Sequence, residues 1–133
     1  AVCVDFSKID QLTIASALAQ GGTKANYLLI HITETAGAMV YGNNISDHET
    51  NEDRIALENY KKQIEAQGYT VDIQIGYGAP RHSIPALAQA FNADLLVMGA
   101  HGHQFLKDVL FGTTLNAVRH KVKIPILIIR DDQ

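Results

Sequence analysis

Cysteine is nearly absent from this chain of 133 residues, because Cys3 is the only one. A single cysteine excludes an internal disulfide and suits a reducing cytoplasm, so we expect a cytoplasmic location. Cys3 lies in an apolar run, which favours a small buried hydrophobe over a redox centre. No block of Lys or Arg is present and the net charge is −3, so nucleic acid or an anionic membrane is not an expected partner. No apolar run has the length of a membrane span, and no signal peptide is recognisable, so direct membrane insertion is not expected.

Familiar catalytic motifs are missing as well. The sequence holds no Gly-Lys-Ser/Thr phosphate loop and no Ser/His/Asp or Cys/His group in a recognisable context, so we predict no catalytic residue. His101 and His103 could join a carboxylate to bind a transition metal, but no third ligand is evident. We therefore predict no metal site and expect both histidines, with Lys107 as a weaker candidate, to donate to phosphate oxygens.

The chain, residues 1–133, has the length of a single domain. Along it, segments with a strand pattern alternate regularly with segments with a helical pattern. Short apolar or alternating runs predict strands at 1–6, 27–33, 70–75, 95–98 and 126–129. Between them, helical patterns cover 8–20, 49–67, 81–91 and 114–122. Five strands alternating with four helices predict an α/β fold, a doubly wound, Rossmann-like parallel sheet with right-handed crossovers and helices on both faces.

The periodicity also predicts which side chains face inward. For the first helix the inward candidates are Ile9, Leu12, Ser16 and Ala19, with Ile14 and Leu18 on a neighbouring face. For the second they are Ile55, Leu57, Tyr60 and Ile64. We interpret its charged residues as a solvated face: Glu49, Glu52, Asp53, Glu58, Lys61 and Lys62. Residues 34–48 are expected to form an irregular connection, either a cover over a ligand or a surface for a partner.

One stretch carries a chemical signature. The buried strand 95–98 ends at Gly99, and Gly102 follows. After nine intervening residues come Gly112 and Thr113, just before a helix. Glycine lets the backbone approach a ligand closely, and free amides at a helix start with a hydroxyl beside them can cradle phosphate. Open α/β sheets bind their ligands at the carboxyl ends of central strands, which is where this stretch lies.

The spacing Gly-x2-Gly-x9-Gly-Thr after a strand ending in Met-Gly resembles the ATP-binding motif of the universal stress protein family, and it matches at Gly99, Gly102, Gly112 and Thr113. The resemblance covers essentially the whole chain and implies the strand order 3-2-1-4-5. It implies ATP as the ligand, or else ADP or AMP, with magnesium as an optional companion. It also implies a homodimer formed through the last strand, 126–129.

The resemblance further implies a set of nucleotide-binding residues. An acidic residue beside the nucleotide corresponds to Asp5, followed by Phe6 and Ser7, and the backbone that meets adenine corresponds to Ile32. The full predicted set is Asp5, Phe6, Ser7, Ile32, Met98, Gly99, His101, Gly102, His103, Gly112, Thr113 and Thr114. Two plainer roles stay open: Asp5 or Ser7 could cap the following helix, and His31 is expected to be a hydrogen-bonded core residue rather than a ligand.

The function most consistent with these features is an ATP-binding regulatory module of a stress response. A slow ATP hydrolase or phosphotransferase using the same pocket is one alternative, and a nucleotide-free dimerisation module is another. The chain starts inside an apparent strand at Ala1, from which we expect a domain excised from a larger protein, such as one fused to a membrane transporter.

Overall fold

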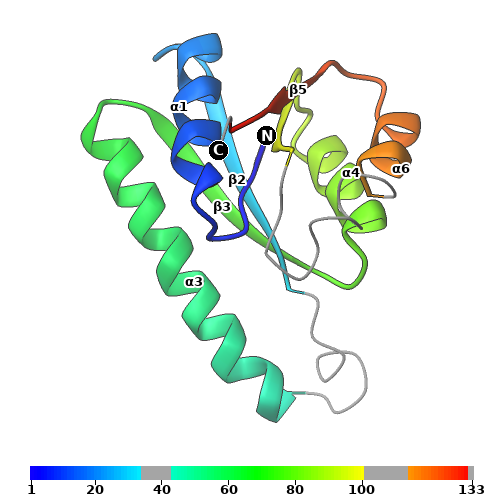
Figure 1. Cartoon of the computed structure of the whole chain (residues 1–133). Helices are drawn as coiled ribbons and strands as arrows, with labels where there is room; N and C mark the ends of the chain where they lie inside the picture. The colour runs from blue at the N-terminus through cyan, green and yellow to red at the C-terminus, as the bar shows by residue number, and fades with distance from the viewer. Residues whose placement is uncertain (34–42, 101–113, 132–133) are drawn as a thin grey trace.

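A single parallel sheet forms the centre of the protein (Figure 1). The computed structural model describes residues 1–33, 43–100 and 114–131, with only the backbone of residues 43–49. Its strands are β1 (Val2–Cys3), β2 (Asn26–Thr33), β3 (Thr70–Tyr77), β4 (Leu96–Gly99) and β5 (Ile126–Ile129). All four neighbouring pairs are parallel, and the order is β3-β2-β1-β4-β5. The predicted five-stranded sheet and its strand order are confirmed.

Helices cover both faces of this sheet, as predicted. The helices described are α1 (Ile9–Gly21), α3 (Asn43–Ala66), α4 (Pro80–Ala90) and α6 (Leu115–Lys121). In Figure 1, α1 and α3 lie on one side of the sheet and α4 and α6 on the other. None of the described helices is both long and apolar enough to cross a membrane.

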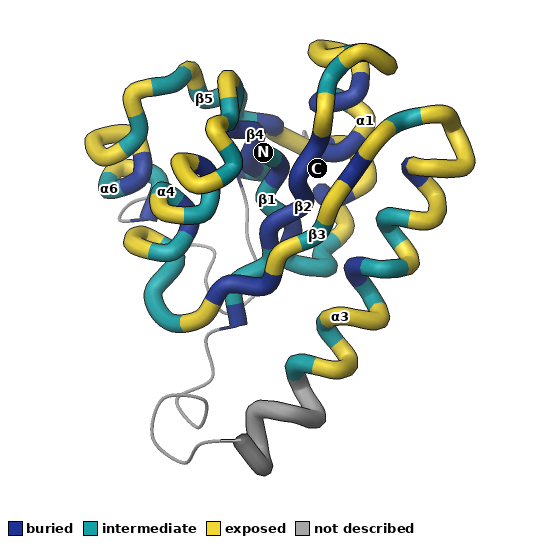
Figure 2. The backbone as a smooth tube through the Cα atoms, turned by 180° about the vertical axis from the view of Figure 1, so that it is seen from behind, coloured by how far each residue is buried: buried dark blue, intermediate teal, exposed yellow. Residues whose placement is uncertain are grey.

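The central strands are buried because successive side chains enter two different cores. Leu29 of β2 packs with Leu57 of α3 in the core beneath α1 and α3. On the other face, Leu96 of β4 packs with Ile84 of α4 and Val118 of α6. Figure 2 shows the buried strands at the centre and exposed residues along the outer sides of the helices. Continuous apolar runs are typical of strands that are covered on both faces.

Helix α3 is longer than the sequence pattern predicts. It begins at Asn43, so the expected irregular connection is wrong over residues 43–48, while residues 34–42 lie outside the described part of the chain. The first turns of α3 contain Asn43, Asn44, Ser46 and Asp47, residue types that are common in loops. The same residue types are also favoured where helices begin, which explains the misplaced boundary.

Three predictions about helix faces are also wrong. Leu12 is 45% exposed, Ile55 is 62% exposed, and Ala19 is exposed as well. The face of α1 that is in fact buried consists of Ile9, Asp10, Thr13, Ile14, Ala17 and Leu18. Two polar residues belong to this face, so a search for apolar spacing alone moves the predicted stripe onto the wrong side. Leu57 and Ile64 of α3 are buried, as expected.

The ends of the strands differ slightly from expectation. The ladder of β1 covers only Val2–Cys3, and β3 continues through Gly76 to Tyr77. A Cβ at Gly76 would lie 2.5 Å from Cδ1 of Ile32 and 2.9 Å from Cδ1 of Leu87, so a side chain there would clash with the core beneath α4. Strands β3 and β5 are the two edges of the sheet.

Candidate functional site

The switch point of this sheet lies between β1 and β4. The chain leaves β1 towards α1 on one face of the sheet, and the helix between β4 and β5, α6, lies on the other face (Figure 1). Where successive connections diverge in this way, the carboxyl ends of the two strands border a crevice that binds ligands in open α/β sheets. Of the residues predicted from sequence, Asp5, Ile32 and Gly99 lie beside this crevice.

Register brings three predicted or adjacent residues into one row across the central strands. Val2 is paired with Leu29 on one side and with Val97 on the other. Three residues beyond Val2, Leu29 and Val97 lie Asp5, Ile32 and Ala100, respectively. Ala100 is the residue that follows Gly99. Backbone bonds extend the ladder towards this row, with Val4 N donating to Ile30 O (2.9 Å) and Ala100 N donating to Ile129 O (2.7 Å). Parallel strands therefore place Asp5 between the ends of β2 and β4.

Asp5 has one carboxylate oxygen engaged and one without a partner. Oδ1 accepts hydrogen bonds from the backbone amide of Ser7 (3.0 Å) and from its hydroxyl (2.5 Å). No residue in the described part of the chain donates to Oδ2. The turn just before α1 thus accounts for one oxygen. The capping interpretation is wrong, because the N-cap residue of α1 is Lys8 and the helix receives no capping hydrogen bond from a side chain. The second oxygen can accept a hydrogen bond from a ligand hydroxyl.

Phe6 adopts a left-handed backbone conformation, with φ of 64°. Such a conformation is costly for a bulky residue and persists where surrounding contacts hold it. The ring of Phe6 packs against His31, with ring centroids 4.3 Å apart, and against Tyr60 at 5.9 Å. The side chain of Phe6 therefore belongs to the packing beneath α3, and its backbone borders the candidate site.

The other predicted site residues contribute mainly backbone. Met98 is 6% exposed and packs in the core beneath α4 and α6, which also receives the side chain of Ile32. Gly99 ends β4, and Thr114 is buried before the first residue of α6, with no capping hydrogen bond from its side chain. The remaining predicted residues, His101, Gly102, His103, Gly112 and Thr113, together with Lys107, lie outside the described residues.

Sequence reasoning missed Asp10, a carboxylate directly beneath the Asp5–Ser7 loop. Asp10 is 1% exposed. Its Oδ1 accepts a hydrogen bond from Asp5 N (3.2 Å), and its Oδ2 accepts from Phe6 N (2.7 Å) and from the hydroxyl of Tyr60 in α3 (3.0 Å). Burial first, and then repulsion by Asp5, raise the pKa of Asp10 to about 7. An acidic residue on a helix face otherwise lined by Ile14 and Leu18 is the signal that could have revealed it.

A second polar contact joins β2 to α3. His31 lies within the sheet with Nδ1 3.0 Å from the carbonyl of Val4 and Nε2 3.2 Å from Oδ2 of Asp53. The same carboxylate oxygen accepts a hydrogen bond from the hydroxyl of Thr33 (3.0 Å). The expectation that Asp53 belongs to a solvated face is wrong, because its side chain is only 17% exposed and is paired. His31 is a hydrogen-bonded core residue, as predicted.

Cys3 is half-buried rather than fully buried, and its side chain packs against the core beneath α4 and α6. Burial raises the pKa of the Cys3 thiol to about 12, so the reactive thiolate is disfavoured. Within the ranges that the structure describes, no group of three or more His, Cys, Asp or Glu side chains is arranged to hold a metal ion.

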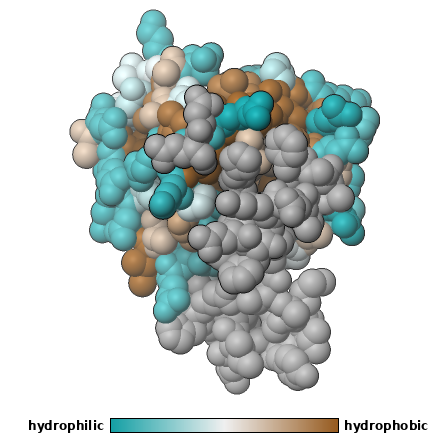
Figure 3. All heavy atoms as spheres, viewed as in Figure 1, coloured by the Kyte–Doolittle hydropathy of each residue, from teal (hydrophilic) through white to brown (hydrophobic). Residues whose placement is uncertain are grey.

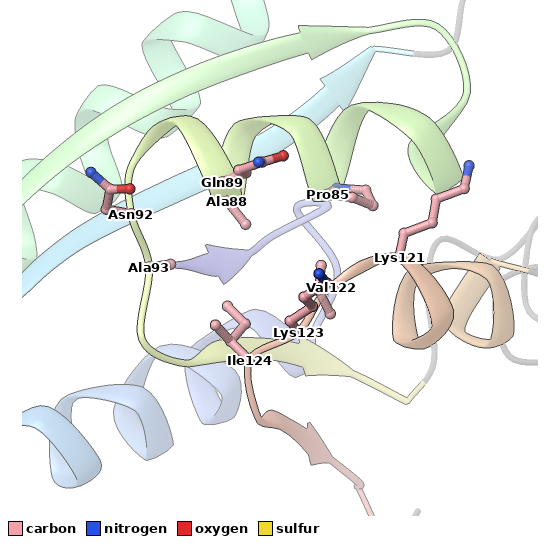
Figure 4. Close-up of a pocket in the computed structure, with 9 residues that line it drawn as sticks. All are labelled: Pro85, Ala88, Gln89, Asn92, Ala93, Lys121, Val122, Lys123 and Ile124. Carbon is pink, nitrogen blue, oxygen red and sulfur yellow. The ribbon is translucent and has the colours of Figure 1, made fainter.

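A separate hollow lies away from the candidate site (Figure 4). It measures about 300 Å³ and is formed by α4 with the residues that follow it and by the segment from Lys121 to Ile124. Asn92 and Ala93 precede β4, and Ile124 precedes β5, so this hollow borders the amino ends of the strands. It is therefore at the edge opposite to Asp5.

Comparison with known proteins supports the relationship that the glycine spacing suggests. The sequence pattern of the universal stress protein family matches residues 1–130. The chain belongs to the universal stress protein family. Universal stress protein MJ0577 of Methanocaldococcus jannaschii is 31% identical over 90 residues, which are 68% of this chain and 56% of that protein. Universal stress protein Slr1230 of Synechocystis is 32% identical over 85 residues, which are 62% of this chain and 30% of that protein.

Solved structures share the fold over nearly the full chain. The structure of MJ0577 superposes with a TM-score of 0.84 at 26% identity and covers 99% of this chain and 96% of that one. A universal stress protein solved in complex with cAMP superposes with a TM-score of 0.65 at 21% identity and covers 96% and 92% of the two chains. The matched segment spans about half or less of the two curated relatives, MJ0577 and Slr1230, although the structural match to MJ0577 extends along nearly all of it.

Proposed function

We propose that this universal stress protein domain binds an adenine nucleotide, with ATP as the expected ligand, at the carboxyl ends of β2, β1 and β4. The observation that carries the proposal is the row of Asp5, Ile32 and Ala100 at the switch point, together with Oδ2 of Asp5, which has no partner within the described ranges. A carboxylate in this position can accept a hydrogen bond from a ribose hydroxyl. Adenine would lie against the backbone near Ile32.

Two further observations support this choice of ligand. A related structure contains cAMP, which is an adenine nucleotide. The sequence after Gly99 has the Gly-x2-Gly-x9-Gly-Thr spacing, which suits phosphate groups because glycines allow close approach of backbone amides. In this arrangement the phosphates would lie over residues 99–114, and Mg²⁺ would accompany them.

The role proposed for the bound nucleotide is regulatory rather than catalytic. Asp5 is the one carboxylate of the predicted set, and its two oxygens are assigned to Ser7 and to a ribose hydroxyl. Slow turnover of ATP would therefore need a base from another residue. Incubation with Mg-ATP and assay of released phosphate distinguishes the two roles, and we expect no turnover beyond a slow background.

Two measurements test the binding proposal. Mass spectrometry identifies any nucleotide released from the denatured protein, and calorimetry measures binding of ATP, AMP and cAMP. We expect Asp5→Asn to weaken ATP binding about tenfold, because the amide replaces an acceptor by a donor. Asp72→Asn is the matched control, since Asp72 is exposed on the edge strand β3. Gly112→Val should abolish binding. Equal affinities of the parent and Asp5→Asn would refute the placement of the ribose.

We also propose that two copies pair through β5. This strand is a sheet edge, and its residues Ile126, Leu127 and Ile128 are only half-buried. In Figure 3, hydrophobic atoms gather in the upper part of the surface, where β5 lies in Figure 1. An edge strand with apolar side chains is a template for pairing with a second chain.

Backbone geometry provides a sharp test of this pairing. Pro125 O and Ile129 O both accept hydrogen bonds from β4, so the alternation along a strand directs the amide of Leu127 towards β4 and that of Ile128 outward. Ile128→Pro should therefore give a folded monomer, whereas Leu127→Pro should disrupt the sheet. Sedimentation velocity and circular dichroism provide the two readouts. A parent protein that is monomeric at micromolar concentration would contradict the pairing.

A further inference from the structure

The loop that carries Asp5 is held from below by side chains that no motif of the sequence includes. Asp10 accepts the amides of Asp5 and Phe6, which are consecutive residues of this loop. Its third hydrogen bond comes from Tyr60, fifty positions away in sequence and on another helix. One buried carboxylate therefore joins α1, the loop and α3.

We propose that Asp10 is a positioning residue for the nucleotide site and that Tyr60 acts through Asp10. The position of α3 against the sheet would in this way set the orientation of Asp5. The inference rests on the proposed function for the ligand, but the contacts that carry it lie wholly within described residues.

Backbone strain indicates why such support is needed. Phe6 holds φ of 64° without being glycine. The shortest hydrogen bond to Asp10, 2.7 Å, comes from the amide of this same residue. A charged acceptor makes stronger hydrogen bonds than a neutral one, so it can offset the cost of an unfavourable conformation. The direction in which Asp5 points depends on this conformation, because Asp5 immediately precedes Phe6.

Helix α3 contacts the loop at a second place, through His31. The ring of Phe6 stacks on His31, and His31 bonds both the carbonyl of Val4 and the carboxylate of Asp53. Both ring nitrogens face oxygen acceptors, so both contacts are hydrogen bonds when the ring carries two protons. The segment from Val4 to Phe6 is thus tied to α3 at Tyr60 and at Asp53. A displacement of α3 would move both ties together.

The charge of Asp10 makes this arrangement pH-sensitive. The titratable groups that face it are Asp5 from the loop, Tyr60 from α3 and Cys3 from β1. No cationic side chain among the described residues neutralises it. The ionised carboxylate accepts all three hydrogen bonds, whereas the protonated form carries a hydrogen on one oxygen and is a weaker acceptor. The loop should therefore be held more firmly at pH 8 than at pH 6.

Two tyrosines of the chain allow a matched comparison. Tyr60→Phe removes the hydroxyl that bonds Asp10. Tyr27→Phe removes a hydroxyl that donates to Gly22 O (2.7 Å) and lies 3.5 Å from Leu18 O. Both variants remove one bonded tyrosine hydroxyl, so Tyr27→Phe controls for a general loss of stability. Only Tyr60→Phe should disturb the loop at Asp5.

The experiment measures ATP affinity by calorimetry and amide exchange by NMR in the parent and both variants. We expect Tyr60→Phe to weaken ATP binding three- to tenfold and to accelerate exchange at Asp5 and Phe6, with Tyr27→Phe within twofold of the parent in both. A third variant, Asp10→Asn, removes the titration. The ratio of its ATP dissociation constant to that of the parent should grow between pH 6 and pH 8, and the protonation of ATP cancels in this ratio.

The outcomes separate the inference from the proposed function. A parent that binds no nucleotide refutes the proposed function, and the exchange measurement then decides whether α3 holds the loop. Parent-like exchange and affinity in Tyr60→Phe would overturn the inference, whatever the parent binds. Equal weakening in Tyr27→Phe would also overturn it, because the effect would then follow general stability.

Discussion

The two faces of the sheet are built on different principles. Beneath α4 and α6, the buried hydrophobic cluster consists of Ile84, Ala88, Leu96, Met98 and Val118, and among the described residues Thr114, just before α6, is the one buried polar residue beside it. Beneath α1 and α3, an apolar core of similar kind is interrupted by Asp10, Thr13 and Thr33, and by the paired side chains of His31 and Asp53. The polar groups gather near the carboxyl ends of β1 and β2, beside the candidate site.

This difference indicates a division of roles between the faces. An apolar core stabilises the fold through burial alone, and any residue of suitable size and hydrophobicity contributes to it. A buried carboxylate such as Asp10 costs free energy unless its hydrogen bonds compensate, so its presence needs another explanation. Orientation of the loop at Asp5 is that explanation here. We therefore expect changes on the apolar face to affect stability and changes on the polar face to affect binding.

The largest effect on stability should come from the apolar face. Leu96 is fully buried there, and Leu96→Ala should lower the free energy of unfolding by about 3 kcal/mol, from lost transfer energy and the cavity that remains. Leu12→Ala is the control, because Leu12 is 45% exposed, and it should cost about 0.5 kcal/mol or less. Urea denaturation measures both. ATP affinity of the folded Leu96→Ala protein should stay at the parent value, and a tenfold loss would break the proposed division between faces.

A smaller effect, and one of opposite sign, is expected on the polar face. The pKa of Asp10 is raised to about 7, so the folded protein binds a proton more tightly than the unfolded chain does. The contribution of Asp10 to the free energy of unfolding is therefore greatest below about pH 4 and declines as the pH rises towards 7. Asp10→Asn should remove this decline, of which about 2.5 kcal/mol falls between pH 5 and pH 8.

The measurement is urea denaturation of the parent and Asp10→Asn at pH 5 and pH 8. The difference in free energy of unfolding, variant minus parent, should be more positive at pH 8 than at pH 5. The variant should nevertheless bind ATP more weakly than the parent at pH 8. If the role of Asp10 were purely structural, Asp10→Asn would instead lose stability and ATP affinity in parallel at the higher pH. That parallel loss would remove the distinction between the two faces.

Much of the fold was predictable because the strands are covered on both faces. Runs such as 27–33 and 95–98 are apolar throughout, and such runs separated by helical segments define a parallel sheet. The strand order came from family resemblance rather than from periodicity. Periodicity failed where buried positions are polar, which is why Leu12 was predicted to be inside and the face with Asp10 and Thr13 was not.

The site was predictable only in part. Asp5 and Ile32 lie at the expected edge because parallel strands end together, and the register brings them side by side. The support beneath them was not predictable, since Asp10 and Tyr60 are far apart in sequence and neither belongs to a motif. Likewise, a charged residue at Asp53 reads as solvated until the fold places His31 opposite it. Contacts of this kind depend on tertiary packing, which spacing along the chain does not encode.

Hydrogen exchange at pH 8, followed by mass spectrometry with and without saturating ATP, tests the central claim most directly. We expect protection in peptides covering residues 4–8 and 99–114, and none in peptides covering 119–125, which border the hollow at the opposite edge. Protection in residues 34–42 would in addition assign the connection after β2 to the site. Unchanged exchange at residues 4–8 in the presence of ATP would contradict a nucleotide site built around Asp5.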